Sequence, residues 1–306
     1  MKICSLLPSA TEILFALGLG EAVVGVSHEC DFPPEARRKP RVIESVIDQN
    51  AWSSDAVDQI VVDHLRRKQS LYRIDLNRLR DLKPDLIVTQ ELCEVCAIDA
   101  SEVTRAIGSL SHRPAIVSLH PHTLSEMLDD IVRLGEGTGR AGEASRVVDS
   151  LKTRLERIRY LVAEAPLKPR VFCMEWLKPP MASGHWVPEM VGVAGGIEVI
   201  GRTGEPSRYV EWERVVAAQP EALILMPCGF PIERTKREVA AVRALAGWEK
   251  LPAVQQQRVY LVNGPAYYNR SGPRLVDGVE IFAELWHPDR CRGLIPPGAV
   301  ERLEDG

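Results

Sequence analysis

Short apolar segments rich in β-branched residues recur along this chain and alternate with segments of helical periodicity. In the first half they are KICSLL (2–7), AVVGVS (22–27), DLIVTQ (85–90) and AIVSLH (115–120), and in the second half RVFCMEW (170–176), IEVIG (197–201), EALILMPC (221–228) and VYLVNG (259–264). Strands that are apolar along nearly their whole length are buried on both faces, which is typical of parallel sheets covered by helices. The pattern therefore predicts an α/β fold.

The two halves of the sequence also resemble each other. LRDLKPDLIVTQ (79–90) and VVAAQPEALILMPC (215–228) share a helix end, a proline, an acidic residue and a buried strand. Between the halves, apolar residues keep helical spacing from Ala141 to Ala165, behind a capping box at Thr123 and Glu126. We therefore expect two similar α/β lobes with parallel sheets, residues 1–122 and 167–306, joined by a bridging helical segment over 123–166 that contains one long helix.

A second capping box is expected near the N-terminus. Ser9 and Glu12 follow the first apolar strand and precede ILFALGLG. A serine followed three residues later by a glutamate can satisfy two free N–H groups at the start of a helix. We predict a short helix capped by Ser9 and closed by Gly18 and Gly20.

Charge and hydropathy exclude several classes of protein. The 306 residues include 38 basic and 42 acidic side chains, for a net charge of -4, and no basic cluster is interleaved with aromatics, so nucleic acid is not an expected partner. No apolar run approaches the roughly 18 residues of a membrane span, and no secretory signal pattern is present. We expect a cytoplasmic protein whose seven cysteines are reduced thiols.

Unusual side chains follow the predicted strands. In open parallel sheets, ligands bind outside the carboxyl ends of the strands. The segments in these positions are HECDFPP (28–34), QELCEVC (90–96), EWLKPPMASGHW (175–186), PCGF (227–230) and NGPAYYNRSGP (263–273). Thiols, imidazoles and aromatic rings are concentrated in them, so we expect these loops to form one ligand cleft between the two lobes.

At these residues the chain resembles a known family. LLPSATEILFALGLGEAVVGVSHECDFPPEA, LRDLKPDLIVTQ, VFCMEWLKPPMASGHWVPEMVGVAGG and YYNRSGPRLVDGVEIFAELWHP are similar, in this order, to segments of the cobalamin-binding receptors of ABC importers, which are class III substrate-binding proteins. The resemblance spans nearly the whole chain. It implies two Rossmann-like lobes bridged by one long backbone helix, a small-molecule ligand in the cleft, and an ABC permease as partner if the chain is exported.

The resemblance also implies a set of ligand-binding residues and cobalamin, or a related corrinoid, as the ligand. In this sequence the set is Cys30, Asp31, Phe32, Gln90, Glu91, Trp176, Gly184, His185, Trp186, Gly229, Phe230, Tyr267, Tyr268, Asn269 and Arg270. Aromatic rings can stack on the rim of a flat corrin, and polar groups can bond its amide arms. Trp176, Trp186, Tyr267 and Tyr268 suit stacking, whereas Asp31, Gln90 and Asn269 suit hydrogen bonding.

Two other readings of the same residues stay open. His28, Cys30, Cys93 and Cys96 would make a tetrahedral Cys3His site for zinc, and cysteine and histidine ligands would also suit haem. Alternatively, Cys93 and Cys96 could serve a thiol-dependent enzyme, although the flanking Glu91 and Glu94 oppose thiolate formation. Because no local signature marks a nucleophile, the sequence favours a binding protein over an enzyme.

Overall fold

The computed structural model of the chain describes residues 1–48, 51–67, 69–90, 100–108 and 113–304. The fold divides into two compact units. Unit 1 contains Met1–Asp48, Gln59–Pro121 and Glu126–Asp149, and unit 2 contains Gln49–Asp58, His122–Ser125 and Ser150–Gly306. None of the described helices is both long and apolar enough to cross a membrane.

Unit 1 is built on a six-stranded sheet with the order β4-β3-β2-β1-β5-β6. The strands are β1 (Ile3–Ser5), β2 (Val23–Ser27), β3 (Arg41–Ser45), β4 (Tyr72–Ile74), β5 (Leu86–Gln90) and β6 (Ala115–Leu119). All neighbouring pairs are parallel except β3 with β4. The carboxyl ends of β2, β1, β5 and β6 therefore meet at one edge of the sheet, which confirms the parallel arrangement that the apolar runs predicted.

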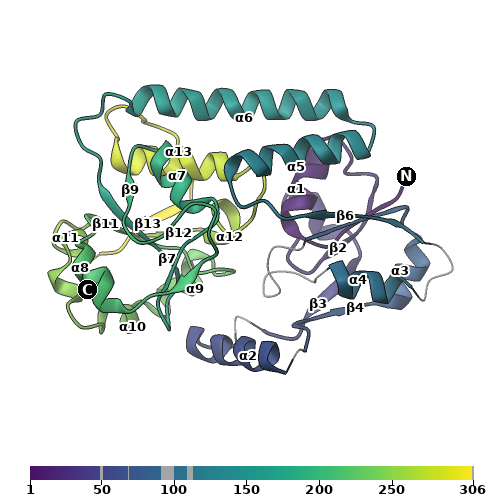
Figure 1. The fold of residues 1–306 in the computed structure, drawn as a ribbon, viewed down its shortest axis with the longest axis horizontal. Coiled ribbons are helices and arrows are strands. Elements are labelled where there is room, and N and C mark those ends of the chain that lie inside the picture. Colours follow the sequence, from purple (N-terminus) through teal and green to yellow (C-terminus); the bar gives the residue numbers. More distant parts are fainter. Residues whose placement is uncertain (49–50, 68, 91–99, 109–112, 305–306) are drawn as a thin grey trace. The chain divides into compact units, whose positions relative to one another are not determined.

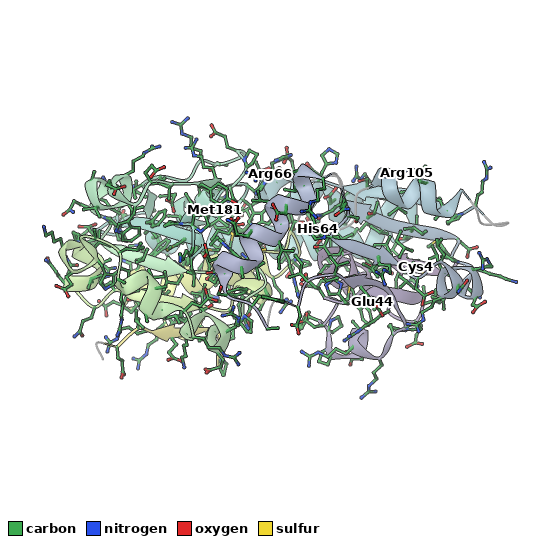
Figure 2. All side chains as sticks on the ribbon, turned by 90° about the horizontal axis from the view of Figure 1, so that it is seen from below. Cys4, Glu44, His64, Arg66, Arg105 and Met181 are labelled. Atoms are coloured by element: carbon green, nitrogen blue, oxygen red, sulfur yellow. The ribbon has the colours of Figure 1, made fainter. Side chains whose placement is uncertain are left out.

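Helices complete unit 1. They are α1 (Pro8–Ala16), the 3-10 helix η1 (Pro34–Arg38), α3 (Leu76–Leu82) and α4 (Ala100–Ile107), and three further helices contain residues of both units, namely α2 (Ser54–Arg66), α5 (Leu124–Gly137) and α6 (Ala141–Val162). Cys4 of β1 (Figure 2) is fully buried in the core of this unit, and burial raises the pKa of its thiol to about 12. This agrees with a structural role for Cys4 as a small apolar residue.

The start of α1 differs from the capping box expected at Ser9. The helix begins one residue earlier, at Pro8, and its cap position is Leu7, which has no side-chain acceptor. Proline suits the first helical position because its fixed φ fits a helix and the missing N–H had no helical partner there. Ser9 therefore lies inside the first turn and is not the cap. The helix ends near the expected place, since Gly18 adopts a φ of 72°.

Unit 2 is built on a second mixed sheet with the order β10-β8-β7-β11-β12-β13, and β9 also pairs with β7. The strands are β7 (Arg170–Trp176), β8 (Met181–Ala182), β9 (Ile197–Glu198), β10 (Arg208–Tyr209), β11 (Ala222–Leu225), β12 (Val259–Val262) and β13 (Val300–Arg302). The central strands β7, β11 and β12 are parallel, as are β7 and β9. Short antiparallel strands border them.

Both faces of the unit 2 sheet are covered. The helices are α7 (Val187–Val193), α8 (Trp212–Ala218), α9 (Ile232–Lys236), α10 (Val239–Arg243), η2 (Trp248–Lys250), α11 (Pro252–Gln255), α12 (Gly264–Tyr267) and α13 (Leu275–Trp286). One core contains Phe172 and Leu223 with Trp212 and Trp248. Helix α13 packs beside α7 (Figure 1), and its Phe282 is fully buried.

The long helix α6 confirms the prediction of one extended helix after residue 141. Its C-terminal half runs along α13 (Figure 1), where Arg154 binds two carboxylates of that helix. The Nε atom of Arg154 donates to Glu280 over 2.9 Å, and its Nη2 atom lies 2.5 Å from both Glu280 and Asp277. Paired, charge-assisted hydrogen bonds of this kind hold the side chains in one orientation and also stabilise the contact. They anchor α6 to unit 2.

Candidate functional site

Predicted site residues of unit 1 lie at the carboxyl edge of its sheet. Gln90 is the last residue of β5, opposite Leu119 of β6, and its side chain is buried. The loop after β2 carries His28 to Phe32. Phe32 is 41% exposed. The sheet therefore brings Gln90 and the β2 loop to one edge, as the sequence predicted.

Cys30 has a well-defined structural environment at this edge. Its Sγ atom accepts from the Thr11 hydroxyl over 3.0 Å and lies 3.2 Å from the Ser27 hydroxyl. Thr11 also donates to Ser5 over 2.8 Å. The thiol is buried and ties the ends of β1 and β2 to α1. Both of these contacts of the thiol are with hydroxyl groups of unit 1.

His28 and Asp31 are held by their surroundings in the same loop. The His28 ring lies 5.8 Å from the ring of Tyr72, and its Nε2 atom is 3.8 Å from a Glu29 carboxylate oxygen. The carbonyl oxygen of Asp31 accepts from Arg37 Nε over 3.1 Å, so the arginine holds the backbone of the loop.

Three predicted site residues, Glu91, Cys93 and Cys96, lie outside the described residues. Within the part of the chain that the structure describes, no group of three or more His, Cys, Asp or Glu side chains is arranged to hold a metal ion. The proposed tetrahedral site needs both Cys93 and Cys96, so it stays a hypothesis, as does the thiol enzyme.

Unit 2 places two predicted aromatic residues in contact at the carboxyl ends of β7 and β11. The rings of Trp176 and Phe230 lie 5.1 Å apart with a tilt of 54°. The guanidinium of Arg234, in α9, lies 4.2 Å from the centre of the Phe230 ring. Phe230 follows Gly229, whose φ of 78° suits a glycine. The tight turn after β11 thereby directs Phe230 onto Trp176.

The indole N–H of Trp176 is a buried donor without a hydrogen-bond partner among the described residues. The amide oxygen Oδ1 of Asn269 is likewise a buried acceptor without one, while its Nδ2 atom donates to the carbonyl of Met226 over 3.3 Å. A buried polar group without a partner is costly and calls for an explanation such as a ligand. Trp176 and Asn269 are therefore the strongest polar candidates in unit 2.

The Gly184–His185 turn is fixed against the loop before β10. The Gly184 N–H donates to the Ser207 hydroxyl over 3.1 Å, and this hydroxyl donates to Glu175 of β7 over 2.8 Å. A Cβ atom on Gly184 would lie 2.3 Å from the carbonyl oxygen of Glu205, so only glycine fits. His185 itself adopts a φ of 51°.

The imidazole of His185 is paired with that of His122. Their ring centres are 5.6 Å apart, and His185 also lies 5.5 Å from the ring of Trp186. Burial, with a smaller contribution from the nearby His122, lowers the pKa of His185 to about 4. His185 is therefore neutral near pH 7, which is the form of histidine that binds metals.

Two predicted stacking residues lie in the core of unit 2. Tyr268 is 1% exposed, and its ring stacks on Phe282 at 4.6 Å. The Trp186 indole N–H donates to the carbonyl of Tyr268 over 2.7 Å. The Tyr268 hydroxyl donates to the carbonyl of Gly278 over 3.3 Å, so the polar groups of both side chains, unlike the N–H of Trp176, have partners within the protein. We therefore leave Trp186 and Tyr268 out of the proposed ligand surface.

Tyr267 and Arg270 remain candidates at the end of β12. Asn263 caps α12 by accepting from the Ala266 N–H over 3.2 Å, which places the turn that follows. Tyr267 is half-buried, with the Arg274 guanidinium 5.8 Å from its ring centre. Burial is the main reason that the pKa of Tyr267 is raised, so it stays a neutral phenol at pH 7.

Sequence reasoning missed two residues that contact the site. Arg234 lies nine residues beyond the end of β11, inside α9, and no spacing in the sequence marked it. His122 follows the apolar run of β6, which was a weak signal for its position beside His185. Both become visible only when the fold brings separate segments together.

Comparison with known proteins agrees with this architecture. The model of the family described as "Periplasmic binding protein" matches residues 3–266. The vitamin B12-binding protein of Vibrio cholerae is 27% identical over 284 residues, which cover 91% of this chain and 86% of that protein.

Solved structures show the same fold. The periplasmic vitamin B12 binding protein BtuF of Vibrio cholerae superposes with a TM-score of 0.66 at 24% identity, covering 93% of this chain and 95% of that one. A periplasmic heme binding protein from Pseudomonas aeruginosa gives a TM-score of 0.74 at 18% identity, covering 100% and 99%. The chain belongs to the periplasmic binding protein family, and it is a substrate-binding protein with the class III, helical-backbone fold.

Proposed function

We propose that this protein binds cobalamin or a related corrinoid. The observation that carries the proposal is the Trp176–Phe230 pair at the carboxyl end of the unit 2 sheet, together with the unpartnered indole N–H of Trp176. The name of the 27% identical Vibrio cholerae relative supports the same ligand. Half-buried Tyr267, in the same unit, adds aromatic surface of the kind that a flat macrocycle requires.

The unpartnered polar groups favour an amide-bearing ligand. Trp176 Nε1 can only donate a hydrogen bond, and Asn269 Oδ1 can only accept one. A primary carboxamide, such as those on the arms of a corrin, has both an acceptor and donors. A carboxylate, such as a haem propionate, has only acceptors when ionised and would leave Asn269 Oδ1 without a partner.

A second candidate ligand is haem or another metal macrocycle. The specific observation in its favour is His185, whose half-buried imidazole stays neutral at pH 7 beside His122. Neutral imidazole is a good ligand for iron, cobalt and zinc. This candidate needs a ligand whose metal reaches His185, whereas the corrinoid proposal stands on Trp176 and Asn269.

The test is an equilibrium titration of the full chain with cyanocobalamin and, separately, with haemin. Trp176→Ala should weaken cyanocobalamin binding more than tenfold. Trp176→Phe retains a ring but not the N–H, so it should lose about fivefold to tenfold, the value of one hydrogen bond of about 1 kcal/mol. Tyr160→Ala, at a ring that is 81% exposed, is the control and should bind normally. Unchanged affinity in Trp176→Ala would refute the stacking site.

The partner and the compartment are separate proposals. A receptor for an ABC importer must meet its ligand on the side from which the permease takes it up. We expect this chain in the cytoplasm, and we propose a permease partner only where the chain is exported. Fractionation of cells that express the untagged protein tests this. Recovery outside the cytoplasmic membrane would contradict the expected compartment and favour the permease partner.

A further inference from the structure

Residues 51–58, here called the strap, come from the first half of the sequence but pack within unit 2. The strap contains the first residues of α2, which begins at Ser54. The chain before the strap, through Asp48, and the chain after it, from Gln59, belong to unit 1.

One ion pair fastens the strap. Arg234 of α9 is 5% exposed, and its Nη2 atom lies 2.5 Å from a carboxylate oxygen of Glu238. Glu238 accepts from the Ser54 N–H over 2.9 and 3.0 Å and also from the Ser54 hydroxyl. A carboxylate at this position meets the free N–H groups and the positive dipole end of α2.

The same arginine also holds the strap directly. Arg234 Nη2 donates to the carbonyl of Trp52 over 2.5 Å. Two further contacts hold the strap: the Tyr209 hydroxyl donates to the buried Asp58 over 2.6 Å, and Lys178 lies 3.5 Å from Asp55 at the surface. The exposed Lys178–Asp55 pair contributes little, and the buried Arg234–Glu238 pair is the main fastening of the strap before Asp55.

Arg234 joins this fastening to the candidate ligand site. On one side it binds Trp52 and Glu238, and on the other its guanidinium lies on the face of the buried Phe230 ring. Phe230 in turn contacts Trp176. Because protein interiors are close-packed, a shift of Arg234 displaces the ring beneath it. Strap, arginine, Phe230 and Trp176 thus form one continuous set of contacts within unit 2.

We propose that the strap is a detachable fastening of unit 2 and that Arg234, while the strap is attached, positions Phe230 and Trp176. Arg234 is a positioning residue here, since it acts through Phe230. Release of the strap removes the Trp52 and Ser54 contacts from the Arg234–Glu238 pair and loosens the turn after β11. The effect on ligand affinity rests on the proposed function, whereas the coupling between strap and turn does not.

The test is amide hydrogen exchange on the full chain without ligand. Glu238→Gln weakens the fastening, and Glu233→Gln is the matched control, because Glu233 is 78% exposed and pairs only at the surface, with Lys236 at 3.0 Å. In Glu238→Gln we expect about tenfold faster exchange in the strap, the size of one lost charge-assisted hydrogen bond. We also expect faster exchange at the amides of Cys228 and Phe230, whose N–H groups donate to the carbonyls of Glu175 and Pro227, respectively.

Each outcome decides the proposal. Faster exchange in both regions, with β12 unchanged and the control like the native chain, supports it. Faster exchange in the strap alone overturns the positioning role of Arg234, and no change in either region overturns the fastening. If Glu238→Gln accelerates exchange throughout unit 2, the milder Ser54→Ala replaces it; that variant should affect the same two regions by a smaller factor, and failure to do so overturns the proposal.

A second arm distinguishes this inference from the proposed function. The rate at which cyanocobalamin is released is measured for the native chain and for Glu238→Gln. We expect faster release from the variant. If the native chain binds no cyanocobalamin, the proposed ligand is wrong, while the exchange result still decides the coupling. If the native chain binds and the variant releases the ligand at the native rate, the strap does not act on the site and the positioning role is overturned.

Discussion

Replacing Glu198 with glutamine should change how the free energy of unfolding of unit 2 depends on pH. Glu198 joins β9 to the neighbouring strand β7 and to the residues that follow β9. One carboxylate oxygen accepts from the N–H groups of Ile200 and Gly201 at 3.1 Å each, and the other accepts from the Cys173 N–H at 3.1 Å. Burial of the carboxyl group outweighs these hydrogen bonds and raises the pKa of Glu198 from 4.5 to about 7.

The sign of the pH effect follows from this direction. Between pH 4.5 and 7 the unfolded chain ionises Glu198 while the folded chain keeps it protonated, so the unfolded state binds fewer protons and the free energy of unfolding falls as pH rises. The difference between the two pKa values, 4.5 and about 7, corresponds to a loss of about 3 kcal/mol in the free energy of unfolding. About 2–3 kcal/mol of this loss falls between pH 5 and 8. Glutamine does not titrate. The free energy of unfolding of Glu198→Gln, relative to that of the native chain, should therefore rise by about 2–3 kcal/mol from pH 5 to 8.

The assay is urea unfolding followed by tryptophan fluorescence at pH 5, 6, 7 and 8. All six tryptophans belong to unit 2, so the signal reports on this unit. Glu284→Gln is the control. Burial opposes ionisation there, but the N–H groups of residues 293–295 outweigh it and lower the pKa of Glu284, so its difference from the native chain should stay flat from pH 5 to 8. A flat or opposite trend for Glu198→Gln would refute the reasoning.

Two further substitutions test the scaffold. Arg154→Met leaves Asp277 and Glu280 without their shared cation, and we expect a loss of about 2 kcal/mol and a melting temperature about 4–8 °C lower by calorimetry; an unchanged melting temperature would mean that the fork does not anchor α6. Gly184→Ala places a Cβ against the Glu205 carbonyl and should cost about 1–3 kcal/mol, whereas Gly192→Ala, with open space around it, should be tolerated; equal effects would contradict the steric argument.

Much of the fold could be predicted from the sequence, because buried parallel strands leave a strong signal. All eight apolar runs coincide with strands of the structure, and the long helix after residue 141 was anticipated. The strands that were not anticipated, β3, β4, β8, β10 and β13, are five residues long or shorter, and several lie at sheet borders. A two-residue strand such as β10 has too few residues for a periodicity to appear.

The site was predictable by location more than by role. The rule that ligands bind at carboxyl ends of parallel strands identified Trp176 and Phe230, which the fold brings into contact. The same rule also selected Trp186 and Tyr268, whose polar groups are bonded within the protein. The sequence does not say which aromatic side chain after a strand will be bonded in this way. Arg234 and His122 were missed because their roles arise from tertiary contacts.

The central claim is that the native ligand is a corrinoid, and native mass spectrometry of the protein isolated from its own cells tests it most directly, because it identifies the bound molecule without presuming one. The account predicts a one-to-one complex with a corrinoid that Trp176→Ala no longer retains. An iron porphyrin bound in its place, or a zinc ion with no organic ligand, would contradict it.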